Sequence, residues 1–350
     1  MRLHLPALPL IILVACGPAV PISDGVDREE HRYQAVVDDR TITLYMKDDT
    51  AGGKVYRMVT LEDPREDTPI STRITISNRD SIRAEFNSQS GATEPAQLIG
   101  VRGADGTWQL SYGRPGTVPD PIAFAEHPLP IQLERKEYHG SGQVAEPTSD
   151  EVVANGEGNG QASLSVYTYR ITDRNTGQPH PLDAFLQDFI CNGKTYEQFT
   201  TVTGEDWGST TYSASIPHKS EDRVVIRVEQ SYYEEGMAHD QMGSRLINYD
   251  LTSNREMKLA DVVPVKNHGQ LKAMAKKRFY TKYTAEDMPN KTFTFTKNVG
   301  FMHNGIEFLY QPYEMGPFVA GYMSVTLPYS EIMHLMDPNS GLFKALTRKK

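Results

Sequence analysis

The sequence predicts an α+β protein with a small N-terminal all-β region, a meander or partly open barrel, followed by an antiparallel sheet with packed helices. Three observations support this prediction. Many short stretches alternate apolar and polar residues between turn-forming residues, which is the pattern of half-buried strands. Two later stretches carry apolar residues at helical spacing. Residues 139–160 are rich in Gly, Ser, Glu and Asn and have no hydrophobic period, so we expect a linker there.

The N-terminal region, residues 31–138, contains alternating stretches with turn signals between them. Strands are expected at residues 41–46, 55–61, 73–76, 81–86 and 107–112. Trp108 shares one face of the last stretch with Leu110 and Tyr112, so it is expected in a core or at its rim rather than stacked on a sugar. Tyr33, residues 42–44 and the Gly106–Trp108 turn resemble small β-domains near the N-terminus of Bacteroidetes lipoproteins.

The C-terminal region, residues 161–350, mixes strand and helix patterns. Residues 181–190 and 267–283 have the apolar stripe of an amphipathic helix, and strands are expected at residues 162–171, 210–216, 222–233, 245–251 and 256–259. Residues 292–334 then predict a strand, a hairpin turn at Asn304-Gly305, a second strand, a loop with prolines and glycines, a third strand and a short helix.

Composition limits the function classes. A chain of 350 residues has room for two or three domains, and 38% hydrophobic residues fit a folded protein. The formal net charge of −9 argues against nucleic-acid binding, which requires a basic surface to neutralise phosphates. An acidic surface suits a cationic partner, although moderate acidity also serves solubility.

The N-terminus predicts a location. An apolar run from Leu5 to Ala15 is too short to span a membrane and is followed directly by Cys16. Residues 13–16 resemble the bacterial lipobox, which implies a signal peptide at residues 1–15, lipid attachment at Cys16 and a tether over residues 16–30. The protein is then anchored in the cell envelope, at the outer membrane, facing the periplasm or the surface; an ordinary secretory signal is the alternative. Cys191 would be left as a lone thiol, expected to be buried.

Five segments between Ser231 and Met336 resemble, in order, the C-terminal domain of unknown function that RsiV-type anti-sigma factors share with PdaC-type peptidoglycan deacetylases. The segments are residues 231–240, 248–255, 257–263, 312–321 and 325–332. Residues 163–230 resemble the companion domain that usually precedes it. The resemblance implies an extracytoplasmic module associated with the cell wall, and in RsiV-type proteins one that binds lysozyme. The chain shows neither a sigma-binding segment with a transmembrane helix nor a separate deacetylase domain, so the resemblance implies binding.

Two loops carry the candidate site residues. His239 and Asp240, with Glu234 nearby, have the side chains of a metal site or an acid/base pair, although a loop histidine more often bonds to backbone. Tyr313 and Glu314 lie in a loop stiffened by two prolines, which suits recognition of a partner. In the alternative interpretation Tyr313 caps the core and Glu314 accepts a backbone hydrogen bond.

No strong catalytic motif occurs. Glu331 and His334 lie one helical turn apart without the His-Glu-x-x-His pattern, and there is no Gly-x-Ser-x-Gly, phosphate loop, dinucleotide fingerprint or cysteine pair. We therefore expect no cofactor, no metal and no catalytic residues. The sequence favours a lipid-anchored envelope module that binds a lysozyme-like protein or a wall glycan. The alternatives are an envelope hydrolase or deacetylase acting on peptidoglycan, and a structural scaffold; the oligomeric state is open.

Overall fold

The computed structural model describes residues 30–37, 40–51, 54–62, 70–75, 80–86, 96–113, 121–143, 161–201, 208–234, 237–284, 287 and 292–347. The predicted signal peptide, Cys16 and nearly all of the predicted tether lie outside these ranges. The chain divides into two compact units, one formed by residues 1–62 and 68–128 and the other by residues 63–67 and 129–350.

The first unit is a curled antiparallel sheet, a half-barrel, as the sequence predicts. Among the described residues its eight strands follow the order β4-β3-β2-β1-β8-β7-β6-β5, so two four-stranded meanders join where β1 pairs with β8. The strands are β1 Glu30–Val37, β2 Arg40–Ala51, β3 Lys54–Glu62, β4 Ile70–Thr75, β5 Ser81–Phe86, β6 Ala96–Arg102, β7 Trp108–Gly113 and β8 Ile122–Glu126.

The inner face of this half-barrel is apolar because alternate residues of each strand point to the same side. Leu44, Leu98 and Leu110 are fully buried there, and Trp108 is only 1% exposed. The edge of the Trp108 ring contacts Tyr33, with 6.4 Å between ring centroids. Trp108 is therefore a core residue, which confirms the interpretation that it does not offer a surface for sugars.

The second unit begins with a six-stranded sheet in the order β14-β13-β12-β11-β10-β9, counted over the described residues. Its strands are β9 Ile131–Gln143, β10 Gln161–Asp173, β11 Ser209–Lys219, β12 Arg223–Tyr233, β13 Gln241–Asp250 and β14 Arg255–Met257. Four of the five strand pairs are antiparallel, but β10 and β11 run parallel. A parallel pair requires a crossover, and α1 (Pro181–Cys191) and α2 (Tyr196–Phe199) lie in that connection.

The predicted boundary between the regions differs from the observed one. Residues 139–143, predicted to be linker, continue strand β9 and pair with residues 161–165 of β10. Ile131 is buried in the core of the second unit, so this unit begins near Leu129 instead of after residue 160. β9 is an edge strand, and the exposed end of an edge strand needs no alternating apolar residues. Residues 139–143 can therefore belong to a strand and still have the composition of a linker. Residues 144–160 lie outside the described part.

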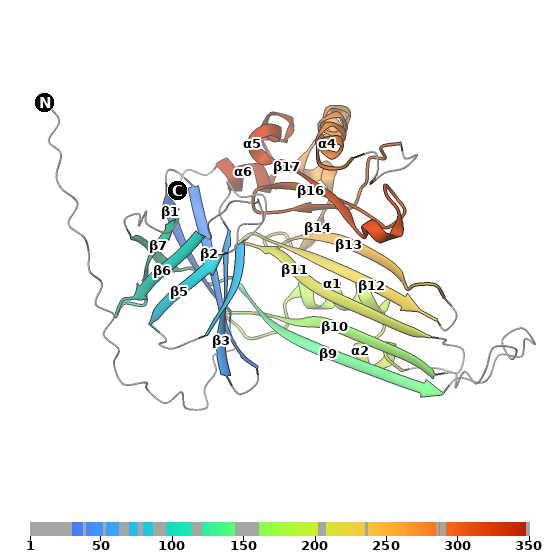
Figure 1. Ribbon diagram of the computed structural model, residues 1–350, viewed down its shortest axis with the longest axis horizontal. Helices are drawn as coiled ribbons and strands as arrows, with labels where there is room; N and C mark the ends of the chain where they lie inside the picture. The colour runs from blue at the N-terminus through green and yellow to red at the C-terminus, as the bar shows by residue number, and fades with distance from the viewer. Residues whose placement is uncertain are drawn as a thin grey trace, which may run out of the picture. The chain divides into compact units, whose positions relative to one another are not determined.

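A three-stranded sheet, in the order β15-β16-β17, forms the next layer (Figure 1). It comprises β15 Val299–Phe301, β16 Gly305–Tyr310 and β17 Met323–Pro328. On one face, Phe308 and Tyr310 pack toward α4 (His268–Lys282) and α5 (Tyr329–Ile332). On the other face, Leu309 and Met302 pack on Val225 and Leu246 of the six-stranded sheet. The three-stranded sheet is therefore covered on both faces. The alternation of residues in its strands instead predicts one face exposed to solvent.

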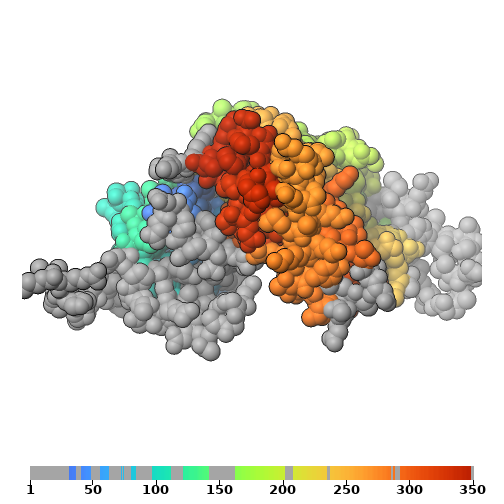
Figure 2. Space-filling model, turned by 90° about the horizontal axis from the view of Figure 1, so that it is seen from above, coloured from blue at the N-terminus to red at the C-terminus, as the bar shows by residue number. Residues whose placement is uncertain are grey.

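The remaining short elements complete this end of the unit. Figure 2 looks onto it, with α4 in orange and the C-terminal helices in red. The elements are α3 Leu259–Val262, α6 Gly341–Thr347 and the 3-10 turns η2 Val265–Asn267, η3 Phe318–Ala320 and η4 Met333–Leu335. No described helix is long and apolar enough to cross a membrane.

The predicted hairpin at Asn304-Gly305 exists, but its glycine has a different role. Gly305 is the first residue of β16, and the chain reverses through Met302–Asn304. A Cβ on Gly305 would lie 2.2 Å from the carbonyl oxygen of Leu327. The glycine therefore allows β17 to approach closely, which is a long-range requirement and not a local turn preference.

Candidate functional site: an aromatic cluster where two loops meet

Side-chain amides bring the second candidate loop to the first. Among the described strands, β14 pairs with only residues 248–250 of β13, so residues 241–247 have a strand partner on one side alone. The side chains of Gln311 and Asn298 bind the backbone on the other side. Gln311 accepts a hydrogen bond from the Ser244 backbone N–H at 2.8 Å and donates to the Ser244 carbonyl at 2.6 Å. Asn298 bonds the backbone of Ser244 and Leu246, both at 2.8 Å. The loop that starts at Gln311 is thereby fixed beside the first residues of β13, next to His239.

His239 and Tyr313, 74 residues apart in the sequence, are in direct contact. The Tyr313 hydroxyl lies 3.0 Å from His239 Nε2, and His239 Nδ1 lies 2.8 Å from the backbone carbonyl oxygen of Asp240. A carbonyl only accepts, so Nδ1 donates to it; in the neutral imidazole Nε2 then accepts from the tyrosine hydroxyl. The Nδ1 bond thus orients the imidazole ring, and Nε2 holds the Tyr313 hydroxyl.

Phe318 of η3 completes the cluster. Its ring stacks on the His239 imidazole, with 3.7 Å between centroids and 15° between planes, and it lies 5.7 Å from the Tyr313 ring. Three aromatic rings from two loops therefore support one another. The neighbouring Val319 side chain is 91% exposed, so an apolar group stands in water beside the rings.

Tyr313 adopts an unusual backbone conformation and remains exposed. Its φ is 67°, in the left-handed region where a residue with a side chain costs about 1 to 2 kcal/mol. Its side chain is nevertheless 55% exposed, so it does not cap the core. Gly316 lies in the same loop and is closely packed, since a Cβ there would lie 2.8 Å from the backbone carbonyl oxygen of Asp287.

The carboxylates near the cluster are engaged in local hydrogen bonds. Glu314 accepts from the Gln311 backbone N–H at 2.9 Å, Asp240 from the Ser231 hydroxyl at 2.6 Å, and Glu234 from the Tyr232 hydroxyl at 2.8 Å. None of these carboxylates bonds the His239 ring in the part of the chain that the structure describes. Glu314 therefore follows the structural alternative, whereas Tyr313 is exposed and does not cap the core.

The predicted site residues thus divide into two groups. His239 and Tyr313 come together, while Asp240, Glu234 and Glu314 stabilise the two loops around them. The sequence predicts the loop from Tyr313 to Gly321 as a recognition segment but does not single out Phe318 and Val319; their signal is a run of apolar residues between two glycines. Over the described residues, no group of three His, Cys, Asp or Glu side chains has the arrangement of a metal site.

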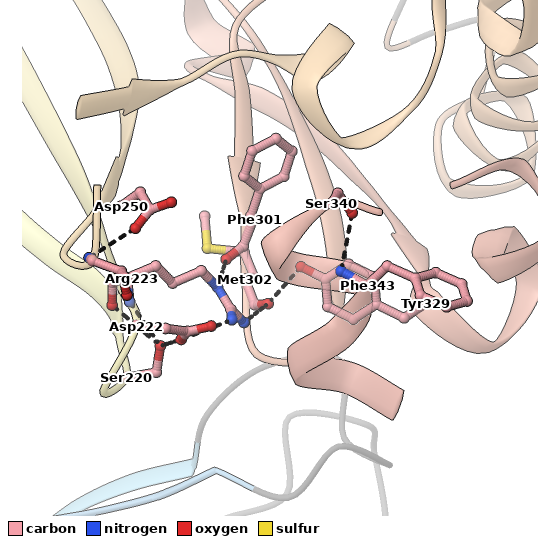
Figure 3. A network of polar contacts seen from close by, with 10 residues as sticks. Ser220, Asp222, Arg223, Asp250, Phe301, Met302, Tyr329, Ser340 and Phe343 are labelled. Atoms are coloured by element: carbon pink, nitrogen blue, oxygen red, sulfur yellow. Dashed lines mark hydrogen bonds and ion pairs between the residues drawn. The ribbon is translucent and has the colours of Figure 1, made fainter. Parts of the chain in front are cut away.

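A buried polar network joins the six-stranded and the three-stranded sheet at the start of β12 (Figure 3). Arg223, only 6% exposed, donates from Nε to the Phe301 carbonyl at 3.3 Å and from Nη2 to the Met302 carbonyl at 3.5 Å. The Tyr329 hydroxyl donates to the same Met302 carbonyl at 2.9 Å. Burial raises the pKa of Tyr329 to about 12, so it remains a donor at neutral pH.

Asp222 balances the charge of Arg223 in this network. Its carboxylate lies 3.4 Å from Arg223 Nη1 and accepts from the Ser220 hydroxyl at 2.6 Å. Burial acts to raise the pKa of Asp222, but the Arg223 charge and the Ser220 hydrogen bond outweigh it and lower the pKa below its usual value. The network fixes the position of the β15–β16 connection against the six-stranded sheet.

Residues 250–330 match the protein family described as "Protein of unknown function (DUF3298)". A solved DUF3298 family protein from Pseudomonas aeruginosa PAO1 is 17% identical, with a TM-score of 0.45 over 61% of this chain and 96% of its own. A solved member from Bacteroides fragilis NCTC 9343 is 14% identical, with a TM-score of 0.49 over 61% of this chain and 98% of its own. Among curated proteins, none matches. The part of the chain from residue 250 to 330, which includes Tyr313 and Phe318, is therefore similar in sequence to a family of unknown function.

Proposed function

We propose that this protein is a lipid-anchored binding module of the bacterial cell envelope, that it is not a catalyst, and that the His239–Tyr313–Phe318 cluster contacts its ligand. The ligand is a cationic protein of the lysozyme type or a peptidoglycan glycan. The acyl chain on Cys16 holds the module at the outer membrane.

One observation carries the binding role: Tyr313 is exposed and yet held by contacts with His239 and Phe318. An exposed aromatic ring without a function needs neither a left-handed backbone nor a histidine partner, and strained residues are typical of functional sites. A ring that is already ordered loses little conformational entropy on binding, so more of its contact energy appears as affinity. Tyrosines of this kind, beside an apolar neighbour such as Val319, are typical binding hot spots.

Charge and chemistry agree with both ligand types. The net charge of −9 attracts a cationic protein over a distance that salt shortens. Aromatic faces also suit the apolar faces of sugar rings, so the same cluster fits a glycan chain. The resemblance to RsiV-type domains supports lysozyme as the first protein to try.

The test is a titration of the purified chain with lysozyme and, separately, with soluble peptidoglycan fragments. Tyr313→Ala should weaken binding by at least about tenfold, as expected for a hot spot. Tyr280→Ala is the matched control, because Tyr280 is similarly exposed, at 44%, but lies on α4. Tyr313→Phe separates the ring from its hydroxyl bond to His239.

Two results would count against the proposal. Equal binding by the parent and by Tyr313→Ala would show that another surface is used, and no binding to either ligand would remove both ligand classes. Turnover of the peptidoglycan fragments, by cleavage or release of acetate, would support the hydrolase or deacetylase alternative; His239→Ala would then show whether the cluster takes part.

A further inference from the structure

The helix α4 is strongly basic in an otherwise acidic chain. Together with the last two residues of the preceding turn η2 it spans residues 266–282, which hold six of the 36 Lys and Arg residues and none of the 45 Asp and Glu residues. The six are Lys266, Lys272, Lys276, Lys277, Arg278 and Lys282. Surface helices of soluble proteins normally mix both signs, because oppositely charged residues four positions apart stabilise the helix.

Packing decides which of these residues face the solvent. Leu271, Ala275 and Phe279 are fully buried in the core, so the opposite side of α4 points outward (Figure 2). Lys272, Lys276 and Tyr280 are exposed and follow one another at intervals of four residues, about 6 Å along the helix. Lys277 is also exposed and flanks this row.

Internal contacts account for only part of this charge. Arg278 forms an ion pair with Glu331 at 2.7 Å, and Lys282 donates to the Ser324 carbonyl at 3.0 Å, which fastens α4 to the edge of β17. Lys272 and Lys277 form no ion pair with any residue that the structure describes. Lys272 and Lys276 are like charges four positions apart, an arrangement that costs helix stability. The fold therefore does not explain the outer row.

We propose that the outer face of α4 docks on an anionic membrane surface, with phospholipid headgroups as its ligands. This inference goes beyond the proposed function and does not depend on the aromatic cluster. A single helix face is convex, which suits a flat bilayer, and its positive charge complements anionic headgroups. Tyr280 adds an aromatic body with a polar tip, and Lys276 Nζ lies 5.9 Å from its ring centre. Lysines beside such an aromatic residue are typical of helices at the bilayer interface.

The predicted lipid anchor would strengthen this contact. An acyl chain on Cys16 keeps the folded module close to the membrane, because a tether of about 14 residues reaches at most about 50 Å. A weak electrostatic contact is sufficient under those conditions, since the effective concentration is already high. Docking through α4 then orients the module on the membrane.

The experiment uses the full chain with Cys16→Ser, so that no lipid is attached, and two kinds of vesicle. One is pure phosphatidylcholine, and the other contains about 30% phosphatidylglycerol, an anionic lipid. The test variant combines Lys272→Gln, Lys276→Gln and Lys277→Gln. The control combines Arg135→Gln on β9, Arg170→Gln on β10 and Lys194→Gln between α1 and α2, which remove three exposed charges outside α4. Circular dichroism confirms that each variant is folded.

The parent should bind the anionic vesicles and release them at about 1 M NaCl. The α4 variant should partition about 100-fold more weakly, because contributions of basic residues near such a surface add, while the control stays within about twofold. Equal loss in both variants, unchanged binding by the α4 variant, or equal binding to both vesicle types would overturn the proposal. Preferential binding to an anionic wall polymer would overturn it as well and identify that polymer as the partner.

Discussion

Tyr313 combines a left-handed backbone, an exposed ring and a hydrogen bond to a histidine that lies far away in the sequence. The left-handed backbone is uncommon for a residue with a large side chain, and with the other two properties it indicates a side chain that the surrounding residues hold in place. Phe318 and the amide of Gln311 are the residues that do so, one by stacking on His239 and the other by fastening the loop to Ser244. The loop therefore holds the Tyr313 ring exposed to solvent, at the cost of a strained backbone conformation.

Replacing Tyr313 by Asn should separate stability from binding. Asparagine tolerates the left-handed region, so relief of strain offsets the lost contacts with His239, and the free energy of unfolding should change by less than about 1 kcal/mol. Binding of the ligand should nevertheless fall as much as in Tyr313→Ala. Urea denaturation combined with the ligand titration tests this, and a loss of several kcal/mol in stability would show that Tyr313 is mainly structural.

Cys191 behaves as a small apolar residue, as the sequence predicts. It is fully buried at the end of α1, and burial raises the pKa of its thiol to about 11. Only the thiolate reacts, so Cys191 in the folded protein should resist iodoacetamide at pH 8 and react within minutes in denaturant. The mass of the peptide that carries Cys191 measures this. Rapid labelling without denaturant would show that this end of α1 opens readily.

At the scale of elements, the local patterns predicted most of the fold. The stripe from Leu182 to Ile190 forms α1, and the alternation from Met323 to Leu327 gives β17 its alternately buried residues. Long-range features were not predictable. Leu309 is buried against a different sheet, the end of β9 has the composition of a linker, and Phe318 meets a histidine 79 positions earlier. Such contacts depend on how the sheets pack on one another, and the spacing of apolar residues along the sequence does not encode that packing.

The network around Arg223 makes a prediction about pH. Replacing Asp222 by Asn should destabilise the protein by about 1 kcal/mol at pH 7, a value kept small because the carboxylate is partly exposed. The pKa of Asp222 is lower in the folded state than in the unfolded chain, near 3.9. Its contribution is therefore complete above about pH 5 and is lost as the pH falls through the lowered folded-state pKa.

Denaturation curves between neutral pH and about pH 3 measure this difference. The gap between the parent and Asp222→Asn should close as the pH falls. Glu134→Gln, which changes an exposed carboxylate on β9, is the control and should show almost no gap at any pH. A gap that stays constant down to pH 3 would mean that the charge of Asp222 does not stabilise the network.

At the scale of the whole molecule, charge and location belong together. The chain is acidic overall, yet α4 concentrates positive charge on one face, and the predicted lipid anchor precedes the folded units. If the module sits on a membrane, the positive charge of α4 faces the anionic lipid. The negative charge of the rest of the protein then attracts the cationic ligand. The aromatic cluster and the exposed residues of α4 have no residue in common, so a ligand and a membrane can contact different side chains of the second unit.

The location itself has a simple test. Cys16→Ser should abolish incorporation of labelled palmitate and move the protein from the membrane fraction to the soluble fraction in a bacterial host. Cys191→Ser is the matched control and should leave both properties unchanged, since this thiol is buried. Continued lipid labelling of Cys16→Ser would show that the lipobox resemblance is misleading.

Hydrogen exchange of the backbone amides, measured with and without lysozyme or peptidoglycan fragments, tests the central claim most directly. Binding through the cluster predicts slower exchange at residues 312–321 and 237–240 and little change on α4 or in the first unit. Protection confined to other segments, or no protection with either ligand at concentrations that saturate binding, would contradict the claim that His239, Tyr313 and Phe318 form the recognition surface.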